Sequence, residues 1–249
     1  MKAFGLFDQE YVRRLPNGYR MILVPSDFLQ GEIFWHGEYD GRTIAWLSRA
    51  LAPDSTFVDV GSHVGYFLLT AAGVARKGRL VGFEPQKALL DQCRRTLDLN
   101  GIRNVELFNL ALSDTNGTAE FHLSHVSNTG MSGLRRPPGE PGEVIPVETA
   151  TFDSLGLAIP SDKPVFVKID VEGAELRVLK GMSAFIREMK PVILIELIPE
   201  LLAAYDTKVS DIHAWLSDMG YHAFRIRADG TLEQVEGYPG SDNMIFKVD

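Results

Sequence analysis

Residues Thr56 to Gly65 read TFVDVGSHVG, an apolar run that leads into an acid and two glycines. A continuous apolar run of this length is typical of a strand buried on both faces of a parallel sheet. Glycine permits the sharp turn and the close approach of backbone to a ligand that the first strand-to-helix connection of an open sheet requires. We therefore expect a binding site at the carboxyl end of this strand.

Short apolar runs and amphipathic stretches alternate onward from this segment, which is typical of parallel strands joined by crossover helices. Strands are predicted at 56–60, 79–83, 105–109, 165–169 and 192–196, with helices at about 64–75, 87–100 and 174–189, the last broken near Gly181. A helix at about 210–219 and strands at 221–226 and 244–248 follow. Such a closing pair places the last strand antiparallel between its neighbours. The predicted fold is α/β, a mainly parallel sheet with helices on both faces.

Two regions fall outside this alternation. Residues 1–55 contain a predicted strand (19–24) and helix (41–51) and are interpreted as an N-terminal cap on a domain of residues 56–249. The segment at about 124–146 is rich in Gly, Pro and Ser, which excludes a regular element. Long irregular segments in compact domains are typically lids or binding loops, so we expect a loop insertion that covers the acceptor.

Composition limits the classes of function. The chain has 249 residues, enough for one α/β domain with extensions, and its formal net charge of -8 disfavours a nucleic-acid partner. Cys93 is the only cysteine, so an intrachain disulfide is excluded. With no secretory signal and no apolar run long enough to span a bilayer, the sequence predicts a soluble cytoplasmic protein without a membrane partner. A homo-oligomer stays open.

The glycine loop has the spacing DxGxxxG rather than GxGxxG. The missing middle glycine is the one that lets backbone meet a pyrophosphate, so a dinucleotide is disfavoured. S-adenosylmethionine has no phosphate, and loop amides near the helix N-terminus can meet its aminocarboxylate. Asp59 would orient this loop or contact the amino group, or it is a simple turn acid at the strand end.

Glu84 ends the second strand and is followed by Pro85. A carboxylate roughly 20 residues past the glycine loop is placed to accept hydrogen bonds from both ribose hydroxyls. After the third strand, Ala111 and Leu112 can flank an adenine ring while Asp114 accepts from its exocyclic amine. Alone, that stretch would be an ordinary Asx turn.

The segment from Lys168 to Glu175 reads KIDVEGAE and is the densest charge group in an otherwise apolar strand. Strand alternation places Lys168 and Asp170 on one face. Carboxylates here would face the reacting centre of an open α/β sheet. In the alternative interpretation Lys168 pairs structurally with one acid, and Glu175 only begins a helix, where acids suit the dipole.

In combination, these motifs resemble the FkbM family of S-adenosylmethionine-dependent methyltransferases over about 54–248: DVGSHVG, FEP (83–85), ALSD (111–114), TFDSL (151–155) and KIDVEGAE. The resemblance implies a Rossmann-like class I methyltransferase with seven strands in the order 3-2-1-4-5-7-6. It also implies O-methylation of sugar or polyketide-like hydroxyls. His63 departs from the commonest family loop. The expected cofactor-binding residues are Asp59, Gly61, Ser62, His63, Gly65, Glu84, Pro85, Leu112, Ser113, Asp114 and Asp170.

The expected chemistry is methyl transfer to a hydroxyl of a small or glycan-like acceptor. A free alkyl hydroxyl has a pKa of roughly 16, near that of water, so a general base is expected during transfer. The candidate bases are His63, Asp170 and Glu172. A divalent metal held by Asp170, Glu172 and Glu196 is the mechanistic rival, possible but not expected.

Acceptor-side residues are expected at the same rim: Glu196, Arg135 and Asn243. Asn243 is included because the first residue of an antiparallel last strand lies beside the carboxyl ends of the parallel strands. Methylation of nitrogen is an alternative, although the Asn-Pro-Pro-Tyr motif of amine methylases is absent. A non-catalytic binding module is the alternative from another class.

Overall fold

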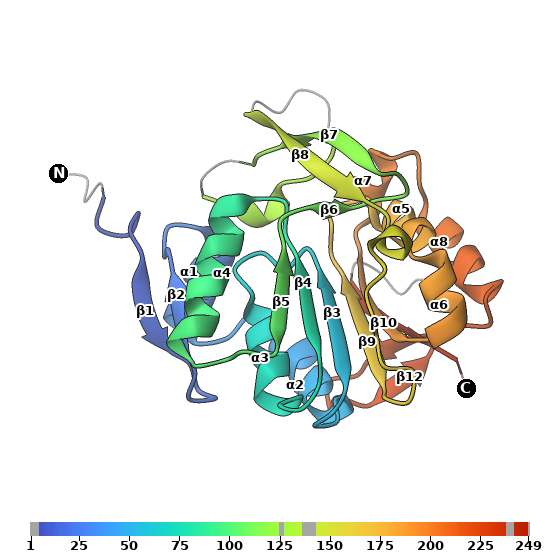
Figure 1. Ribbon diagram of the computed structural model, residues 1–249, viewed down its shortest axis with the longest axis horizontal. Helices are drawn as coiled ribbons and strands as arrows, with labels where there is room; N and C mark the ends of the chain where they lie inside the picture. The colour runs from blue at the N-terminus through green and yellow to red at the C-terminus, as the bar shows by residue number, and fades with distance from the viewer. Residues whose placement is uncertain (1–4, 125–126, 136–142, 238–241, 249) are drawn as a thin grey trace.

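A computed structural model describes residues 5–124, 127–135, 143–237 and 242–248 of the chain. Its centre is an eight-stranded sheet in the order β12-β11-β13-β10-β9-β3-β4-β5 (Figure 1). The strands are β3 (Thr56–Val60), β4 (Leu80–Phe83), β5 (Val105–Phe108), β9 (Val165–Ile169), β10 (Val192–Leu197), β11 (His222–Ile226), β12 (Leu232–Gln234) and β13 (Asp242–Lys247).

The sheet is mainly parallel, as the sequence predicted. β5, β4, β3, β9 and β10 pair in parallel, whereas β13 pairs antiparallel with both β10 and β11. Without β12, the order of the strands along the chain is 3-2-1-4-5-7-6. β12 was not predicted: it adds an eighth strand at the edge, paired antiparallel with β11.

Helices cover both faces of this sheet (Figure 1). Because successive side chains of a strand point to opposite faces, Phe57 of β3 joins one apolar cluster and Val58 joins the other. The first cluster includes residues of α2 (Gly41–Ala50), α3 (Tyr66–Val74) and α4 (Lys87–Leu99). The second includes residues of α5 (Glu175–Gly181), α6 (Ser183–Met189), α7 (Pro199–Ala203) and α8 (Val209–Ser217). The predicted break near Gly181 separates α5 from α6.

The TFDSL segment has a structural role that depends on Asp153. It lies in the short 3-10 helix η2 (Phe152–Leu155), and its carboxylate accepts from the backbone N–H groups of Ala184 and Phe185 at 2.9 and 3.0 Å. These N–H groups belong to the first turn of α6, whose own backbone offers them no partner. The segment therefore acts as a cap that holds α6 on the sheet.

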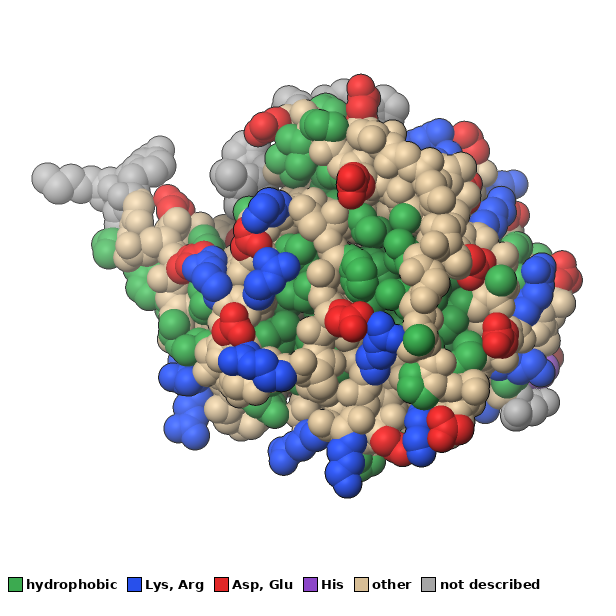
Figure 2. Space-filling view, viewed as in Figure 1, with side chains coloured by type: hydrophobic (Ala, Val, Ile, Leu, Met, Phe, Trp, Pro, Cys, Tyr) green, Lys and Arg blue, Asp and Glu red, His purple; other side chains and the backbone are tan. Residues whose placement is uncertain are grey.

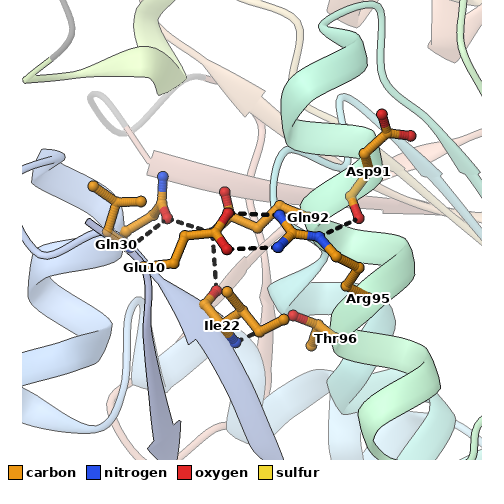
Figure 3. A network of polar contacts seen from close by, with 8 residues as sticks. Glu10, Ile22, Gln30, Asp91, Gln92, Arg95 and Thr96 are labelled. Atoms are coloured by element: carbon orange, nitrogen blue, oxygen red, sulfur yellow. Dashed lines mark hydrogen bonds and ion pairs between the residues drawn. The ribbon is translucent and has the colours of Figure 1, made fainter. Parts of the chain in front are cut away.

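The N-terminal residues pack against α4. β1 (Tyr11–Arg14) and β2 (Arg20–Leu23) form an antiparallel pair, and α1 (Phe28–His36) follows. Gln92 of α4 donates to the backbone oxygen of Ile22 at 2.9 Å and to Gln30 Oε1 at 2.7 Å, as Figure 3 shows. Arg95, also on α4, pairs with Glu10 through both guanidinium nitrogens. These contacts fix α1 beside the carboxyl edge of the sheet.

A second, three-stranded sheet crosses the top of the molecule in Figure 1. It consists of β6 (Ala111–Leu112), β8 (Val144–Ala150) and β7 (Gly117–His122). The expected loop insertion at about 124–146 connects β7 to β8, but its predicted end is wrong: β8 begins at Val144, where the chain pairs antiparallel with β7. Its described part contains the 3-10 helix η1 (Thr129–Met131), whereas 125–126 and 136–142 lie outside the described residues.

Charged side chains of both signs are interspersed on the face that Figure 2 shows, and the described residues seen there form no continuous basic stripe. Among the described residues, the helices are all too short or too polar to cross a membrane.

Candidate active site

A cavity of about 390 Å³ opens at the carboxyl ends of β3, β4, β9 and β10. Its lining brings together the predicted residues Gly61, His63, Glu84, Pro85, Leu112, Asp170, Glu172 and Glu196. Phe28 and Leu29 at the start of α1 and residues 128–132 around η1 line it as well. The carboxyl edge of an open α/β sheet is where such folds bind ligands, and the volume suits a small molecule.

Two glycines shape the loop after β3. Gly61 has φ 81°, and a β-carbon there would lie 1.9 Å from the carbonyl oxygen of Asp170. Gly65 has φ 82°, and a β-carbon there would lie 2.2 Å from Cys93 Sγ. A side chain at either position would therefore separate β3 from β9 or α3 from α4. Gly61 and His63 of this loop line the cavity, and the backbone N–H groups of Gly61 and Ser62 both donate to the carbonyl oxygen of Phe83.

Glu84 is a buried carboxylate at the end of β4. Its Oε2 accepts from the backbone N–H of His63 at 2.9 Å, and its Oε1 accepts from that of Gln86 at 2.8 Å. Burial raises the pKa of Glu84 to about 7, although both N–H groups oppose this shift. Each oxygen keeps acceptor capacity, so a diol that donates two hydrogen bonds would favour the ionised form.

The apolar wall near Glu84 is formed by Phe83, Ala111 and Leu112, which can flank a planar ring. Ser62, Ser113 and Asp114 are not among the residues that line the described cavity. Ser113 is buried and bonded to Ala150, and Asp114 lies 3.9 Å from Arg177. Their roles toward the cofactor stay predictions.

Three acids converge on the opposite side of the cavity. One ligand oxygen each from Asp170, Glu172 and Glu196 lies within 4.8 Å of the others. Lys168 stands behind them on β9, with Nζ 2.8 Å from Asp170 Oδ2 and 3.9 Å from Asp59 Oδ1. Asp59 is buried and outside the cavity lining, so the structure places it next to Lys168 beneath the site.

The acids have different protonation states. Burial opposes ionisation of Asp170, but the charge of Lys168 and the hydrogen bonds with Glu196 and Lys168 together lower the pKa of Asp170. The charge of Asp170, together with burial, raises the pKa of Glu196 to about 10. Burial and then Asp170 raise the pKa of Glu172 to about 9. At neutral pH the cluster therefore offers one carboxylate and two carboxylic acids, which both accept and donate hydrogen bonds.

His63 has a backbone conformation in the left-handed region, φ 50°, which is uncommon for a residue other than glycine. Its Nε2 lies 2.8 Å from Thr129 Oγ1, and its Nδ1 is buried and has no hydrogen-bond partner in the described part of the chain. Burial lowers the pKa of His63, although Asp27 and Asp170 oppose the shift, so the ring is neutral at pH 7. A neutral imidazole nitrogen with a free lone pair can accept a proton.

A metal ion would find hard oxygen ligands in these acids, as the sequence suggested. Lys168, however, already supplies a positive charge to Asp170 at 2.8 Å. The Asp170 carboxylate is thus neutralised by the Lys168 ammonium, and beside it lie Glu172 and Glu196, whose pKa values are raised. Each of those acids would have to lose its proton to bind a cation.

Asn243 lies at the rim, as its position at the start of an antiparallel strand predicted. It is opposite Glu196 in the register of β13 and β10, and it lines a second cavity together with Lys168, Asp170 and Glu196. Its Nδ2 donates to Asp40 Oδ2 at 2.6 Å. The two cavities share Tyr39, Asp170, Glu196 and Ile198, so they adjoin.

Arg135 is placed differently. Its guanidinium donates to the backbone oxygen of Ala204 at 3.0 Å and lies 5.3 Å from the centre of the Tyr205 ring. It is not among the residues lining the described cavity, so its acceptor role stays a prediction without a contact to support it.

Three site residues escaped the sequence analysis: Tyr39, Asp27 and Thr129. Tyr39 lines both cavities, and burial followed by the charge of Glu196 raises its pKa to about 12. Asp27 is the N-cap of α1, and an acid directly before the run FLQGEIFW is a recognisable capping signal. Nothing in the sequence near Thr129 indicates its partners.

Comparison with known proteins identifies the family. A family model for the FkbM methyltransferase domain matches residues 59–223. The hexuronic acid methyltransferase AglP of Haloferax volcanii is 29% identical over 73% of this chain and 69% of its own length. The 2-O-methyltransferase NoeI of Sinorhizobium fredii is 28% identical over 52% of this chain and 58% of its own length. The AMB antimetabolite synthetase AmbE of Pseudomonas aeruginosa is 34% identical over 51% of this chain, which spans only 6% of that protein.

Solved structures support the fold at low identity. TYW2 of M. jannaschii, in complex with AdoMet, has a TM-score of 0.50 at 11% identity, with 97% of this chain and 88% of that chain covered. PH0793 of Pyrococcus horikoshii has a TM-score of 0.51 at 13% identity, with 96% and 71% covered. Because the FkbM match covers both the glycine loop and the acidic cluster, the chain belongs to the FkbM methyltransferase family.

Proposed function

We propose that this protein transfers a methyl group from S-adenosylmethionine to a hydroxyl group of a sugar or sugar-like small molecule. The observation that carries the proposal is that one cavity contains both sets of side chains. Its lining includes Glu84, at the end of β4, and also His63, Asp170, Glu172 and Glu196. A diol-binding carboxylate and a set of hydroxyl-binding acids thus line one space of suitable size.

The residues fit the cofactor. Glu84 would hold the ribose hydroxyls, and Leu112 and Phe83 would flank the adenine. The carbonyl oxygen of Gly61 would accept from the amino group of the cofactor, because the N–H of Gly61 already donates to Phe83. When bound, the cofactor supplies an electrophilic methyl on a positively charged sulfonium. Carboxylates at both ends of the cavity favour a cation there.

The acceptor half suits hydroxyl groups. Asp170 accepts hydrogen bonds, whereas protonated Glu172 and Glu196 also donate them, and a polyol presents donors and acceptors in the same small volume. The two relatives named for hexuronic acid and 2-O methylation support a carbohydrate acceptor. A hydroxyl held by these groups would be oriented for in-line attack.

His63 is the general base in this proposal. Its ring is neutral at pH 7 and its Nδ1 lacks a partner among the described residues, so it can take the hydroxyl proton as the new C–O bond forms. Asp170 is a weaker base because Lys168 lowers its pKa, and Glu172 is protonated at pH 7. With Lys168 supplying the positive charge, turnover should persist after dialysis against a chelator, and a return of lost activity with Mg²⁺ would favour the metal alternative.

The experiment has two stages. Calorimetry with S-adenosylmethionine and S-adenosylhomocysteine should show binding of both, and absence of binding would indicate a non-catalytic module. The protein is then incubated with methyl-labelled S-adenosylmethionine and a panel of methyl glycosides, hexuronic acids and matched amino sugars. Label recovered as a methyl ether supports the proposal, whereas label found only on nitrogen overturns it.

A further inference from the structure

Three residues from distant parts of the chain form a continuous hydrogen-bonded chain at the edge of the cavity. Asp27 is the N-cap of α1, Thr129 begins η1, and His63 lies in the glycine loop. Asp27 Oδ2 is 2.7 Å from both the backbone N and Oγ1 of Thr129, and Thr129 Oγ1 is 2.8 Å from His63 Nε2. Asp27 is buried, with 2% of its surface exposed.

The direction of each hydrogen bond follows from the number of protons available. Asp27 accepts from the backbone N–H of Thr129 and, at 3.0 Å through Oδ1, from that of Gln30. Oδ2 of Asp27 accepts the hydroxyl of Thr129 as well as its backbone N–H. Thr129 therefore donates its single hydroxyl proton to Asp27, and its oxygen has only lone pairs to offer His63. Nε2 must then carry the ring proton, which leaves the lone pair on Nδ1.

We propose that Thr129 and Asp27 are positioning residues that hold His63 in the Nε2-protonated tautomer and so keep the lone pair on Nδ1, the ring nitrogen that would accept the proton of the acceptor hydroxyl. The inference rests on the proposed role of His63 as general base. When Nδ1 accepts the proton, the positive ring stays bonded through Nε2 to Thr129 and, through it, to the Asp27 carboxylate. An orienting acid behind a histidine acts in the same manner in hydrolase triads, although here a threonine hydroxyl lies between the two.

The charged groups around His63 belong to several elements. Asp27 acts from α1 and Asp170 from the end of β9, and both favour a positive ring, whereas Lys168 of β9 opposes it. Glu84, at the end of β4, accepts the backbone N–H of His63 and fixes the loop rather than the ring. Among the described residues, only Thr129 forms a hydrogen bond with a ring nitrogen of His63. Thr129 is therefore the residue to substitute.

The first test needs no acceptor. Protein labelled with ¹⁵N-histidine and saturated with S-adenosylhomocysteine is observed at pH 7.5 by long-range ¹H–¹⁵N correlation, and the signals of His63 are assigned by their loss in His63→Asn. The proposal expects an Nε2-protonated ring in the wild type, a mixture of tautomers in Thr129→Val, and the wild-type pattern in Thr129→Ser. A wild-type ring protonated at Nδ1 overturns it.

The second test uses whichever hydroxyl acceptor the glycoside panel identifies. Thr129→Val should lower kcat about 10- to 100-fold, within the contribution of a general base, and leave the Kd of S-adenosylmethionine within about twofold. Thr129→Ser should restore most of the rate. Asp27→Asn keeps a capping side chain but removes the charge, so it should fold and show a similar loss of kcat.

Thr118→Val is the matched control, because Thr118 is an exposed threonine on β7. It should leave both the ring signals and kcat unchanged. If the Thr129→Val protein has the kcat of the wild type while the His63→Asn protein is inactive, His63 acts without the hydrogen bonds to Thr129 and Asp27. The positioning role is then wrong. If His63→Asn itself keeps full kcat, the base is a different residue. Absence of methyl transfer by the wild type would instead contradict the proposed function, whatever tautomer is observed.

Discussion

A β-carbon added to Gly61 would lie 1.9 Å from the carbonyl oxygen of Asp170. The glycine loop and the acidic segment are therefore in direct backbone contact, although Asp170 follows a different strand. The backbone N–H of Asp170 donates to Val60 at 3.0 Å, which extends the β3–β9 pairing as far as this contact. The position of the glycine loop is thus linked to that of the Asp170 carboxylate.

Gly61→Ala should separate these two segments. The substitution has to move backbone, because the atom that it meets is a carbonyl oxygen, and it also places a β-carbon at φ 81°. We expect binding of S-adenosylmethionine to be lost and the free energy of unfolding to fall by about 1 to 3 kcal/mol beyond the cost of positive φ alone. Urea denaturation and calorimetry measure the two effects.

Gly220→Ala is the control for that variant. Gly220 has φ 86°, and nothing lies within 4 Å of the β-carbon that it would gain. In this variant the free energy of unfolding should fall only by the cost of a β-carbon at positive φ, and the affinity for the cofactor should stay unchanged. Equal destabilisation in both variants would mean that the loop adjusts to the contact with Asp170 without difficulty.

Glu84→Gln should weaken binding of S-adenosylmethionine about 10- to 150-fold, because a hydrogen bond to a charged group is typically worth about 1.5 to 3 kcal/mol. The amide keeps an oxygen for one of the two backbone N–H donors but loses the charge that favours both ribose hydroxyls. Glu106→Gln on β5 removes a half-exposed carboxylate that pairs with Arg79, and it should leave the Kd unchanged. A folded Glu84→Gln protein with wild-type Kd would remove Glu84 from the site.

The strands around the site could be predicted because each is a contiguous buried run. β3 and β9 are buried at every residue, and they stand out in sequence as mainly apolar segments, although β3 contains Asp59 and β9 contains Lys168. The acids Glu84 and Asp170 follow at strand ends, where topology alone brings them to one edge. The short strands β6 and β12, with two and three residues, have no such pattern.

The acceptor side could not be predicted in the same manner. Thr129 and Asp27 are 102 residues apart, and His63 is 66 residues from Thr129, so only the folded chain brings them together. Tyr39 is one aromatic residue among many, and no local spacing marks it as a lining residue. The residues proposed to bind the cofactor lie at strand ends in sequence order, whereas the position of those proposed for the acceptor depends on how the N-terminal cap and η1 pack over that edge.

Stability without ligand should fall as the pH rises from about 4.5 to 7. Burial raises the pKa of Glu175 to about 7 from an ordinary value of 4.5, so in this range the native state holds a proton that the unfolded chain has lost. The native state then binds more protons than the unfolded state, and the contribution of Glu175 to the free energy of unfolding decreases with pH until both states are ionised there above pH 7. Glu172 and Glu196, with pKa values of about 9 and about 10, extend the decrease to higher pH. Urea denaturation of the wild type at pH 5, 6, 7 and 8 measures this slope.

Glu175→Gln isolates the contribution of that residue. Its Oε1 accepts from the backbone N–H groups of Val171 and Gly173, and a Gln oxygen can still do so. In the variant, the change in the free energy of unfolding with pH should be smaller by up to roughly 3 kcal/mol. The change that remains comes from Glu84 and the other acids whose pKa is raised. An identical slope in wild type and variant would show that Glu175 is ionised throughout.

Asn243→Ala should lower turnover without weakening cofactor binding. Asn243 is paired in register with Glu196 across the β10–β13 ladder, and its amide donates to Asp40 at the N-cap of α2. Removing the amide takes away a link between the α2 N-terminus and the wall of the second cavity, where Asp170 and Glu196 also lie.

Loss of one hydrogen bond of ordinary strength corresponds to about a tenfold fall in kcat. The Kd of S-adenosylmethionine should stay within about twofold, since Glu84 and the glycine loop line the other cavity. Steady-state kinetics and calorimetry on the same preparation separate the two quantities, and an equal loss of affinity and turnover would make Asn243 a structural residue of the sheet rather than part of the acceptor side.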